Sequence, residues 1–309
     1  MFYRFEKKLH EVSAISPDPT DLTAAYLSVD ELEKLAPLFG FAPSTVRQCR
    51  EKVRYFRNSI EVYDEYSFGT IKRTGGGPEG VDCIAFYVRK NLFVVVDIRD
   101  SDGSTRAQFE KALRRYPATT LTAEKLIFAF LDAMIEGDGK LLEDMEFGFS
   151  ALEERVLQDD LDEDFTALLL HHKKRLLLLH HYYEQMIDVG EALAENENEL
   201  FDVEDDLRYF RIFTDRAERL LRNVNSLREQ LAQLREAHQS TLDFSLNRTM
   251  KTFTVLNAIF LPLSLLVGWY GMNFDMPEFA WKYGYAFVIG LAIAVVTAFV
   301  FIFRKHRWM

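Results

Sequence analysis

The sequence has little of what would point to an enzyme or a secreted protein. It contains two cysteines among 309 residues, Cys49 and Cys83, and neither lies in a metal-binding spacing. We therefore expect two reduced thiols and no disulfide framework. The first ten residues lack the apolar core of a signal peptide, so no cleaved leader is expected. No nucleophile–base pair or metal triad is visible in the sequence, and we expect neither an enzyme nor a resident cofactor.

A glycine-rich segment, residues 74–80, superficially resembles a phosphate-binding loop. It is not followed by Lys-Ser/Thr or by a helical pattern, both of which a phosphate loop requires. The segment instead predicts the tip of a hairpin.

Positive charge is scarce over most of the chain. Residues 247–309 hold six cations and two anions, whereas the rest of the chain holds 31 cations and 46 anions, a net charge of −15. Binding to nucleic acid requires a basic face, so this composition excludes nucleic acid as a partner. An acidic surface favours cations near the protein instead.

Charge is absent from two long stretches near the C-terminus. No charged residue lies between Lys251 and Asp275, or between Lys282 and Arg304. Each run is long enough for a helix that crosses a bilayer core of about 30 Å. Cations precede the first run and follow the second, so the positive-inside rule places both termini in the cytoplasm. We predict a cell-membrane protein with two spans rather than a hairpin buried in a soluble protein.

Residues 1–120 alternate between strand and helix signals. Segments 1–5, 61–68, 71–73, 81–89 and 92–99 are rich in β-branched and aromatic residues, which favours strands. Ser28 and Glu31 form a capping box that opens a helix ending before Gly40, and Pro43 opens another. These signals predict an α/β domain.

From about residue 122 the sequence pattern indicates helices. We expect one helical stretch to residue 157, with Gly137, Gly139 and Gly148 as weak points, then a run of acids over 159–164 and a second helix over 165–194. No glycine or proline occurs anywhere from Glu191 to Leu261. This uninterrupted run predicts one helix from about Val203 to Tyr270.

The first part of that long helix carries an apolar seam. Its members recur at spacings of three and four, which is typical of a coiled coil. They are Phe210, Phe213, Ala217, Leu220, Val224, Leu227, Leu231 and Leu234.

A second stripe on the same helix runs into the first span and holds most of that span's polar and small residues. Its members are Asn247, Met250, Thr254, Asn257, Leu261, Ser264, Gly268 and Gly271. Continued backward, the stripe contains no cation and three carboxylates, Glu229, Glu236 and Asp243. Polar groups in a span cost free energy unless they face protein or water. If several copies surround an axis with this face inward, they form an acidic funnel that leads to a polar pore. The alternative is a small-residue packing face with the acids solvated.

The outer end of the first span reads Tyr-Gly-Met-Asn-Phe over 270–274, followed by Met-Pro-Glu over 276–278. Together with two C-terminal spans and a basic tail, this pattern resembles the signature of the CorA family of divalent metal ion transporters. Pro262 in the first span and the Tyr-Phe-Arg of residues 209–211 resemble family features too. The resemblance covers the chain from about residue 122 to its C-terminus, whereas residues 1–120 are similar only in being α/β.

The resemblance implies a homopentamer in which five long helices line the pore and the second spans form an outer ring. It implies an α+β membrane protein: an N-terminal α/β cytoplasmic domain, a long helical stalk, two C-terminal transmembrane helices and a funnel. The expected boundaries are residues 1–120 for the α/β domain, 121–249 for the helical and coiled-coil stalk, 250–270 for the pore-lining span, 271–282 for the outer loop, 283–303 for the second span and 304–309 for the basic tail.

The resemblance also assigns site residues. Gly271, Met272 and Asn273 form the ion-selective outer end, where Asn273 meets the ion, and the stripe residues from Asn247 to Gly268 line the conduction path. Mg²⁺ sheds its water reluctantly, and a ring of neutral amides can hydrogen-bond a hydrated ion. Asp275 and Glu278 at the mouth raise the local cation concentration. Mg²⁺, with Co²⁺ or Ni²⁺ as further cargo, is the expected substrate.

The sequence departs from the family pattern at two places. Family members often have an aspartate directly after Tyr-Phe-Arg that helps to bind a regulatory divalent ion, whereas this chain has Ile212. The loop between Asn273 and Met276 is one residue shorter than in familiar members. Regulation by intracellular metal is therefore expected to be weak or altered, unless Asp215 or Asp206 replaces the missing carboxylate.

Three alternatives stay open. Zinc transport is an alternative cargo, although zinc-transporting relatives often change the methionine that Met272 retains. A two-span coiled-coil sensor that conducts nothing would have no need of the polar stripe. The pairs His171-His172 and His180-His181 resemble a zinc site, but their separation along a helix places the pairs on opposite faces, which favours packed or solvated side chains.

Overall fold

The structure is a computed structural model. It describes residues 1–6, 8–13, 16, 19–50, 59–74, 81–100, 102–158, 164–201, 204–272 and 281–305. The chain divides into two compact units: residues 1–153 with 162–233, and residues 154–161 with 234–309. We call them unit 1 and unit 2.

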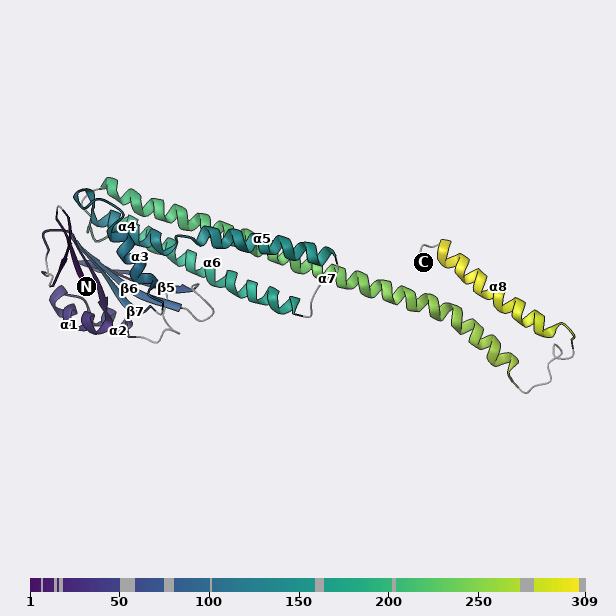
Figure 1. Cartoon of the computed structure of the whole chain (residues 1–309). Helices are drawn as coiled ribbons and strands as arrows, with labels where there is room; N and C mark the ends of the chain where they lie inside the picture. The colour runs from purple at the N-terminus through teal and green to yellow at the C-terminus, as the bar shows by residue number, and fades with distance from the viewer. Residues whose placement is uncertain are drawn as a thin grey trace. The chain divides into compact units, whose positions relative to one another are not determined.

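Unit 1 is built on a mixed seven-stranded sheet (Figure 1). The strands are β1 (Phe2–Phe5), β2 (Leu9–Val12), β3 (Thr23–Ser28), β4 (Ser59–Val62), β5 (Tyr66–Thr74), β6 (Val81–Arg89) and β7 (Leu92–Arg99). Their order is β2-β1-β3-β7-β6-β5-β4, in which β3 and β7 are parallel and the other neighbours antiparallel. A hairpin turn at residues 90–91 joins β6 to β7, and Asn91 adopts the positive φ of 57° that its turn requires.

Both faces of the sheet are covered, which explains why the central strands are apolar without alternation. Helices α1 (Val29–Phe39) and α2 (Pro43–Gln48) pack on one face, where Phe41 stacks on Tyr87 with ring centroids 4.0 Å apart. On the other face, Phe93 of β7 packs against Phe109 of α3 (Ser104–Leu113) and Phe130 of α4 (Ala123–Met134). The capping box of Ser28 and Glu31 is confirmed at the start of α1, and Gly40 ends that helix in the left-handed conformation.

One predicted strand was wrong, and one predicted helical stretch is broken at a glycine that the sequence marks as a weak point. The expected strand over 61–68 is two strands, β4 and β5, because the polar residues Asp64 and Glu65 form a turn between them. The expected helix over 122–157 is interrupted: α4 ends at Met134, and α5 (Asp138–Leu157) follows Gly137, whose φ of 85° favours glycine. The expected tip at 75–80 and the acids at 159–163 lie outside the described residues.

The helices α6 (Phe165–Glu195) and α7 (Arg208–Tyr270) confirm the two long helical predictions, although α7 begins five residues later than expected, after a 3₁₀ turn at Glu204–Leu207. At 1.5 Å per residue, the 63 residues of α7 extend about 95 Å. The helix begins in unit 1 and ends in unit 2.

The apolar seam of α7 is covered by the chain itself. Phe210, Phe213, Ala217 and Val224 are fully buried in a single chain, and Leu227 is nearly so. Gly190 of α6 lies against Phe213 and Thr214 of α7, so α6 supplies part of this cover. The seam over residues 210–231 therefore packs within the chain, and its periodicity does not by itself indicate a coiled coil between copies.

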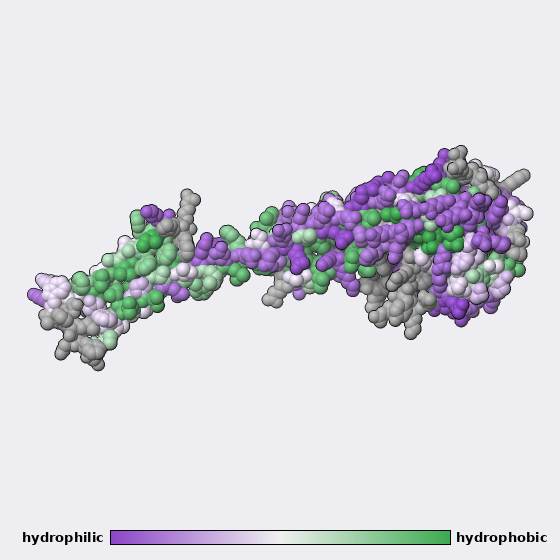
Figure 2. Space-filling view, turned by 180° about the vertical axis from the view of Figure 1, so that it is seen from behind, coloured by the Kyte–Doolittle hydropathy of each residue, from purple (hydrophilic) through white to green (hydrophobic). Residues whose placement is uncertain are grey.

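Unit 2 contains the end of α7 and the helix α8 (Gly284–Lys305). Both are long and apolar enough to cross a membrane, and almost none of the apolar side chains in these segments is buried. The surface of these two segments is largely hydrophobic in Figure 2. The predicted second span, 283–303, agrees with α8 to within two residues.

Candidate ion-conduction site

The polar stripe lies on an uncovered face of α7. Its members Asn247, Met250, Thr254, Asn257, Leu261, Ser264 and Gly268 are all exposed in a single chain. The partly or fully covered positions of the span form another set: Val255, Ala258, Ile259, Pro262, Leu263, Leu266 and Tyr270. At about 100° per residue, the two sets centre on opposite sides of the helix. The face that the sequence assigns to a pore is thus free in a single chain, together with flanking apolar side chains such as Phe260 and Val267.

The polar side chains of this stripe differ in whether they have a hydrogen-bond partner within the chain. The Thr254 hydroxyl donates a hydrogen bond to the Met250 carbonyl at 2.8 Å, so it needs no partner outside its helix. Asn257 and Ser264 make no side-chain hydrogen bond to any residue that the structure describes. An amide in an apolar environment without a partner costs several kcal/mol. These two side chains therefore require water or another protein chain beside them.

Two features shape the backbone of the span. Pro262 has no N–H group, so the Ala258 carbonyl loses its helical donor. At the outer end, the Gly271 amide donates to the Val267 carbonyl at 2.9 Å, and a Cβ on Gly271 would lie only 3.0 Å from that oxygen. Met272 follows with 45% of its surface exposed. The predicted ion-selective end thus begins at a closely packed helix terminus.

The outer mouth itself lies outside the described residues. This applies to Asn273, Asp275 and Glu278, and to Arg307 of the basic tail. The predicted ring of Asn273 amides and the acidic mouth therefore stay predictions.

The three carboxylates of the predicted funnel are exposed. Glu229 belongs to unit 1, whereas Glu236 and Asp243 belong to unit 2. Asp243 accepts a hydrogen bond from Gln239 at 3.2 Å. Ile212, at the position where the family often has aspartate, is 39% exposed. Its side chain and that of Asp215 are available to whatever lies beside this part of α7.

The histidine pairs have ordinary partners in α5 and α6. His172 packs edge-on against Phe149, and burial together with the neighbouring His171 lowers the pKa of His172. His180 and His181 each lie 3.2 Å from a carboxylate oxygen of Glu184. Each pair thus has a packing or charge partner, which favours packed or solvated side chains over a zinc site.

One carboxylate cluster was missed by the sequence reasoning. Asp82 at the start of β6 and Asp100 and Asp102 after β7 each place an oxygen within 4.8 Å of the others. Asp82 accepts from the Ser104 hydroxyl and Asp100 from the Arg106 amide. No local spacing signals this cluster, because the pairing of β6 with β7 brings residues 82 and 100 together.

These features define a two-span membrane protein. It has a mixed-sheet domain, a long helix that runs into an apolar segment, and a second apolar helix. Its first span has a free polar face. Residues 22–305 match the model of the family described as CorA-like Mg²⁺ transporter protein. The chain belongs to this family, which consists of transporters and not enzymes. The match begins at residue 22, well before the region in which the motifs were found.

Individual relatives agree with this assignment. The chain is 24% identical to the cobalt/magnesium transport protein CorA of Thermotoga maritima over 98% of this chain and 89% of the relative. It is 39% identical to the magnesium transport protein CorA of Haemophilus influenzae, over 31% of this chain and 33% of that protein. The solved CorA magnesium transporter of Methanocaldococcus jannaschii matches with a TM-score of 0.82 and 20% identity, covering 100% of this chain and 98% of that one. The predicted fold and the two membrane spans are confirmed.

Proposed function

We propose that this protein is a passive channel that admits Mg²⁺ to the cell through a homopentameric pore lined by α7, with both termini in the cytoplasm. The observation that carries the proposal is the free polar face of the first span. Five copies with this face inward give Asn257 and Ser264 the water that they need. The family match and the magnesium transport named for the relatives support Mg²⁺ as the ion.

The chemistry of the lining suits a hydrated divalent ion. Mg²⁺ usually keeps several waters when it binds, and the amides of Asn257 and of Asn273 can hydrogen-bond those waters without replacing them. A ring of carboxylates would hold the ion more tightly and slow its exit. Leu261 and Met250, exposed on the same face, supply apolar constrictions that can close the pore by dewetting.

Entry of the ion is driven by the membrane potential and needs no nucleotide hydrolysis. An inside-negative potential contributes about 2.3 kcal/mol per charge per 100 mV, and twice that for a divalent ion. Glu229, Glu236 and Asp243, all exposed on the same stripe, then offer the entering ion an acidic path to the cytoplasm.

The test is Mg²⁺ flux into liposomes that contain the wild type, Asn257→Leu or the matched control Val267→Leu. Both changes introduce leucine into the same helix, but Val267 lies about 110° away from the centre of the stripe. We expect Asn257→Leu to reduce Mg²⁺ flux at least about tenfold and Val267→Leu to leave it unchanged. The reason is that passage of a charged ion through an apolar ring is energetically unfavourable. Equal flux in all three proteins would refute the pore assignment.

A panel of ions in the same liposomes distinguishes the alternatives. Faster flux of Zn²⁺ than of Mg²⁺ would identify a zinc transporter. No flux of any divalent ion from a correctly assembled protein would support the two-span sensor.

A further inference from the structure

A cleft of about 600 Å³ lies wholly within unit 1, between the end of α4 and the part of α7 around residues 216–223. Four arginines line it, Arg115 from the turn after α3 and Arg216, Arg219 and Arg222 from α7. Asp132 and Glu136 are the acids in the lining, which leaves a net charge of +2. This is unusual in a part of the chain that carries a net charge of −15.

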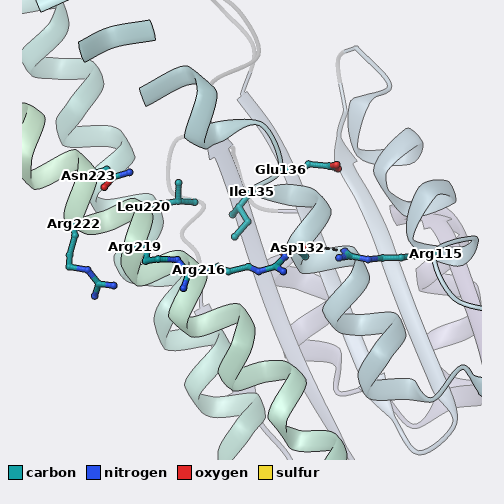
Figure 3. A pocket seen from close by; sticks show the side chains of 9 residues that line it. All are labelled: Arg115, Asp132, Ile135, Glu136, Arg216, Arg219, Leu220, Arg222 and Asn223. Atoms are coloured by element: carbon teal, nitrogen blue, oxygen red, sulfur yellow. Dashed lines mark hydrogen bonds and ion pairs between the residues drawn. The ribbon is translucent and has the colours of Figure 1, made fainter. Parts of the chain in front are cut away.

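Two of the arginines are held in fixed positions. In Figure 3, Arg115 and Arg216 reach Asp132 from opposite sides. The Arg115–Asp132 distance is 2.7 Å, and Asp132 itself is only 8% exposed. Both guanidinium groups also lie over the ring of Phe128, at 5.1 Å for Arg115 and 5.6 Å for Arg216. A guanidinium has five N–H donors, so each retains donors beyond those that Asp132 accepts.

The other two arginines are less constrained and border the same space. Arg219 makes no hydrogen bond or ion pair with any residue in the described parts of the chain, and it extends toward Arg216 in Figure 3. Among the described residues, Arg222 is paired with Glu218 alone, one turn away on the exposed surface, at 3.1 Å. An exposed pair of this kind contributes little free energy, so Arg222 can exchange its partner for a ligand at low cost.

We propose that this cleft binds a nucleoside di- or triphosphate, with the phosphoryl chain on the arginines and the nucleoside along Leu220 and Asn223. Guanidinium groups match phosphate oxygens in geometry and charge. The fixed pair provides two guanidiniums without an ordering cost. A volume of about 600 Å³ lies in the range of small-molecule sites and far exceeds what one phosphate fills.

The experiment measures binding of ATP to the detergent-solubilised full chain by equilibrium dialysis, without divalent cations. The variant is Arg219→Glu, and the matched control is Arg228→Glu, which makes the same charge change on the same helix at an exposed position outside the cleft. We expect saturable ATP binding that Arg219→Glu weakens about tenfold to a hundredfold, as for loss of charge-assisted hydrogen bonds. Arg228→Glu should change the affinity less than about twofold, as screened surface charges do.

Competing ligands test the chemical class. AMP and inorganic pyrophosphate should each compete at least about tenfold more weakly than ATP, because each lacks part of the proposed contacts. Pyrophosphate or citrate that competes as well as ATP would overturn the nucleoside assignment. An equal effect of the two arginine variants would also overturn the proposal, because it would indicate diffuse charge attraction.

The alternative to nucleotide binding is that the arginines contact another copy of the chain. Absence of saturable ATP binding, combined with a smaller assembled fraction of Arg219→Glu in size-exclusion chromatography, would assign Arg219 to such a contact and refute the ligand site.

Discussion

Gly190 lies in α6 where that helix approaches α7 closely. A Cβ at this position would overlap the Thr214 hydroxyl oxygen and come within 3.0 Å of Phe213 Cδ1. Neither side chain can move away easily: Phe213 is fully buried, and the Thr214 hydroxyl donates to the Phe210 carbonyl at 3.1 Å. We therefore expect Gly190→Ala to force α6 and α7 apart, although alanine favours a helix.

Gly148 in α5 provides the matched control. It is exposed, and a Cβ there would meet nothing within 4 Å. Both substitutions gain the helix propensity of alanine, about 0.8–1.0 kcal/mol. The difference between them isolates the overpacking term, which is about 1–3 kcal/mol for a well-packed site.

The assay is thermal unfolding of the detergent-solubilised chain followed by far-UV circular dichroism. For a domain of this size 1 kcal/mol corresponds to about 2–4 °C in Tm. An overpacking term of about 2 kcal/mol thus places the Tm of Gly190→Ala about 4–8 °C below that of Gly148→Ala. The double variant Gly190→Ala/Thr214→Ala should recover part of the loss, because the overlapping oxygen is gone and neighbouring changes are not additive. A Tm of Gly190→Ala at or above that of Gly148→Ala would show that the two helices pack less closely than the structure indicates.

Three further predictions concern the mouth, regulation and pH. Asn273→Ala should abolish Mg²⁺ uptake while size-exclusion chromatography shows unchanged assembly; undiminished uptake would contradict the proposed amide ring. Ile212→Asp should make flux close more steeply with cytoplasmic-side Mg²⁺ than in the wild type, because Mg²⁺ needs oxygen ligands that isoleucine lacks; steep closure of both proteins would show that the missing aspartate is irrelevant. Burial raises the pKa of Asp138 above its ordinary value of 3.8, so its favourable contribution to stability is present at low pH and is lost as the pH rises through the raised pKa. The Tm of the wild type minus that of Asp138→Asn should therefore fall as the pH rises from about 4. A Tm difference that does not vary with pH would refute the raised pKa of Asp138.

Much of the fold could be predicted because its signals are local. The capping box at Ser28, the left-handed glycine at Gly40 and the hairpin at Asn91 depend on residues within a few positions of one another. The long helix could be predicted because no glycine or proline interrupts residues 191–261. One failure was local too: hydrophobic content alone did not separate β4 from β5. Gly137 was a predicted weak point, and its positive φ ends the helical stretch there.

The functional assignments differ in how far they depend on the fold. Each of the two spans and the tripeptide at residues 271–273 is a continuous segment of the chain, so the sequence alone determined the two membrane spans and the family resemblance. The arginine cleft and the Asp82–Asp100–Asp102 cluster join residues from separate elements. Arg216, Arg219 and Arg222 recur every third residue of α7, but no spacing along the chain places them beside Arg115 and Asp132.

The two stripes of α7 show most directly what the sequence determined and what only the tertiary structure decided. Both recur at spacings of three and four, so periodicity determined that each forms one face of a helix. It did not determine what each face meets, because a helix face packs equally well against its own chain or against another copy. The structure buries the seam from Phe210 to Leu231 within the chain and leaves the stripe from Asn247 to Gly268 uncovered. The physical reason is that apolar side chains gain free energy from leaving water against neighbouring helices of the same chain, whereas Asn257 and Ser264 need hydrogen-bond partners that these helices do not supply.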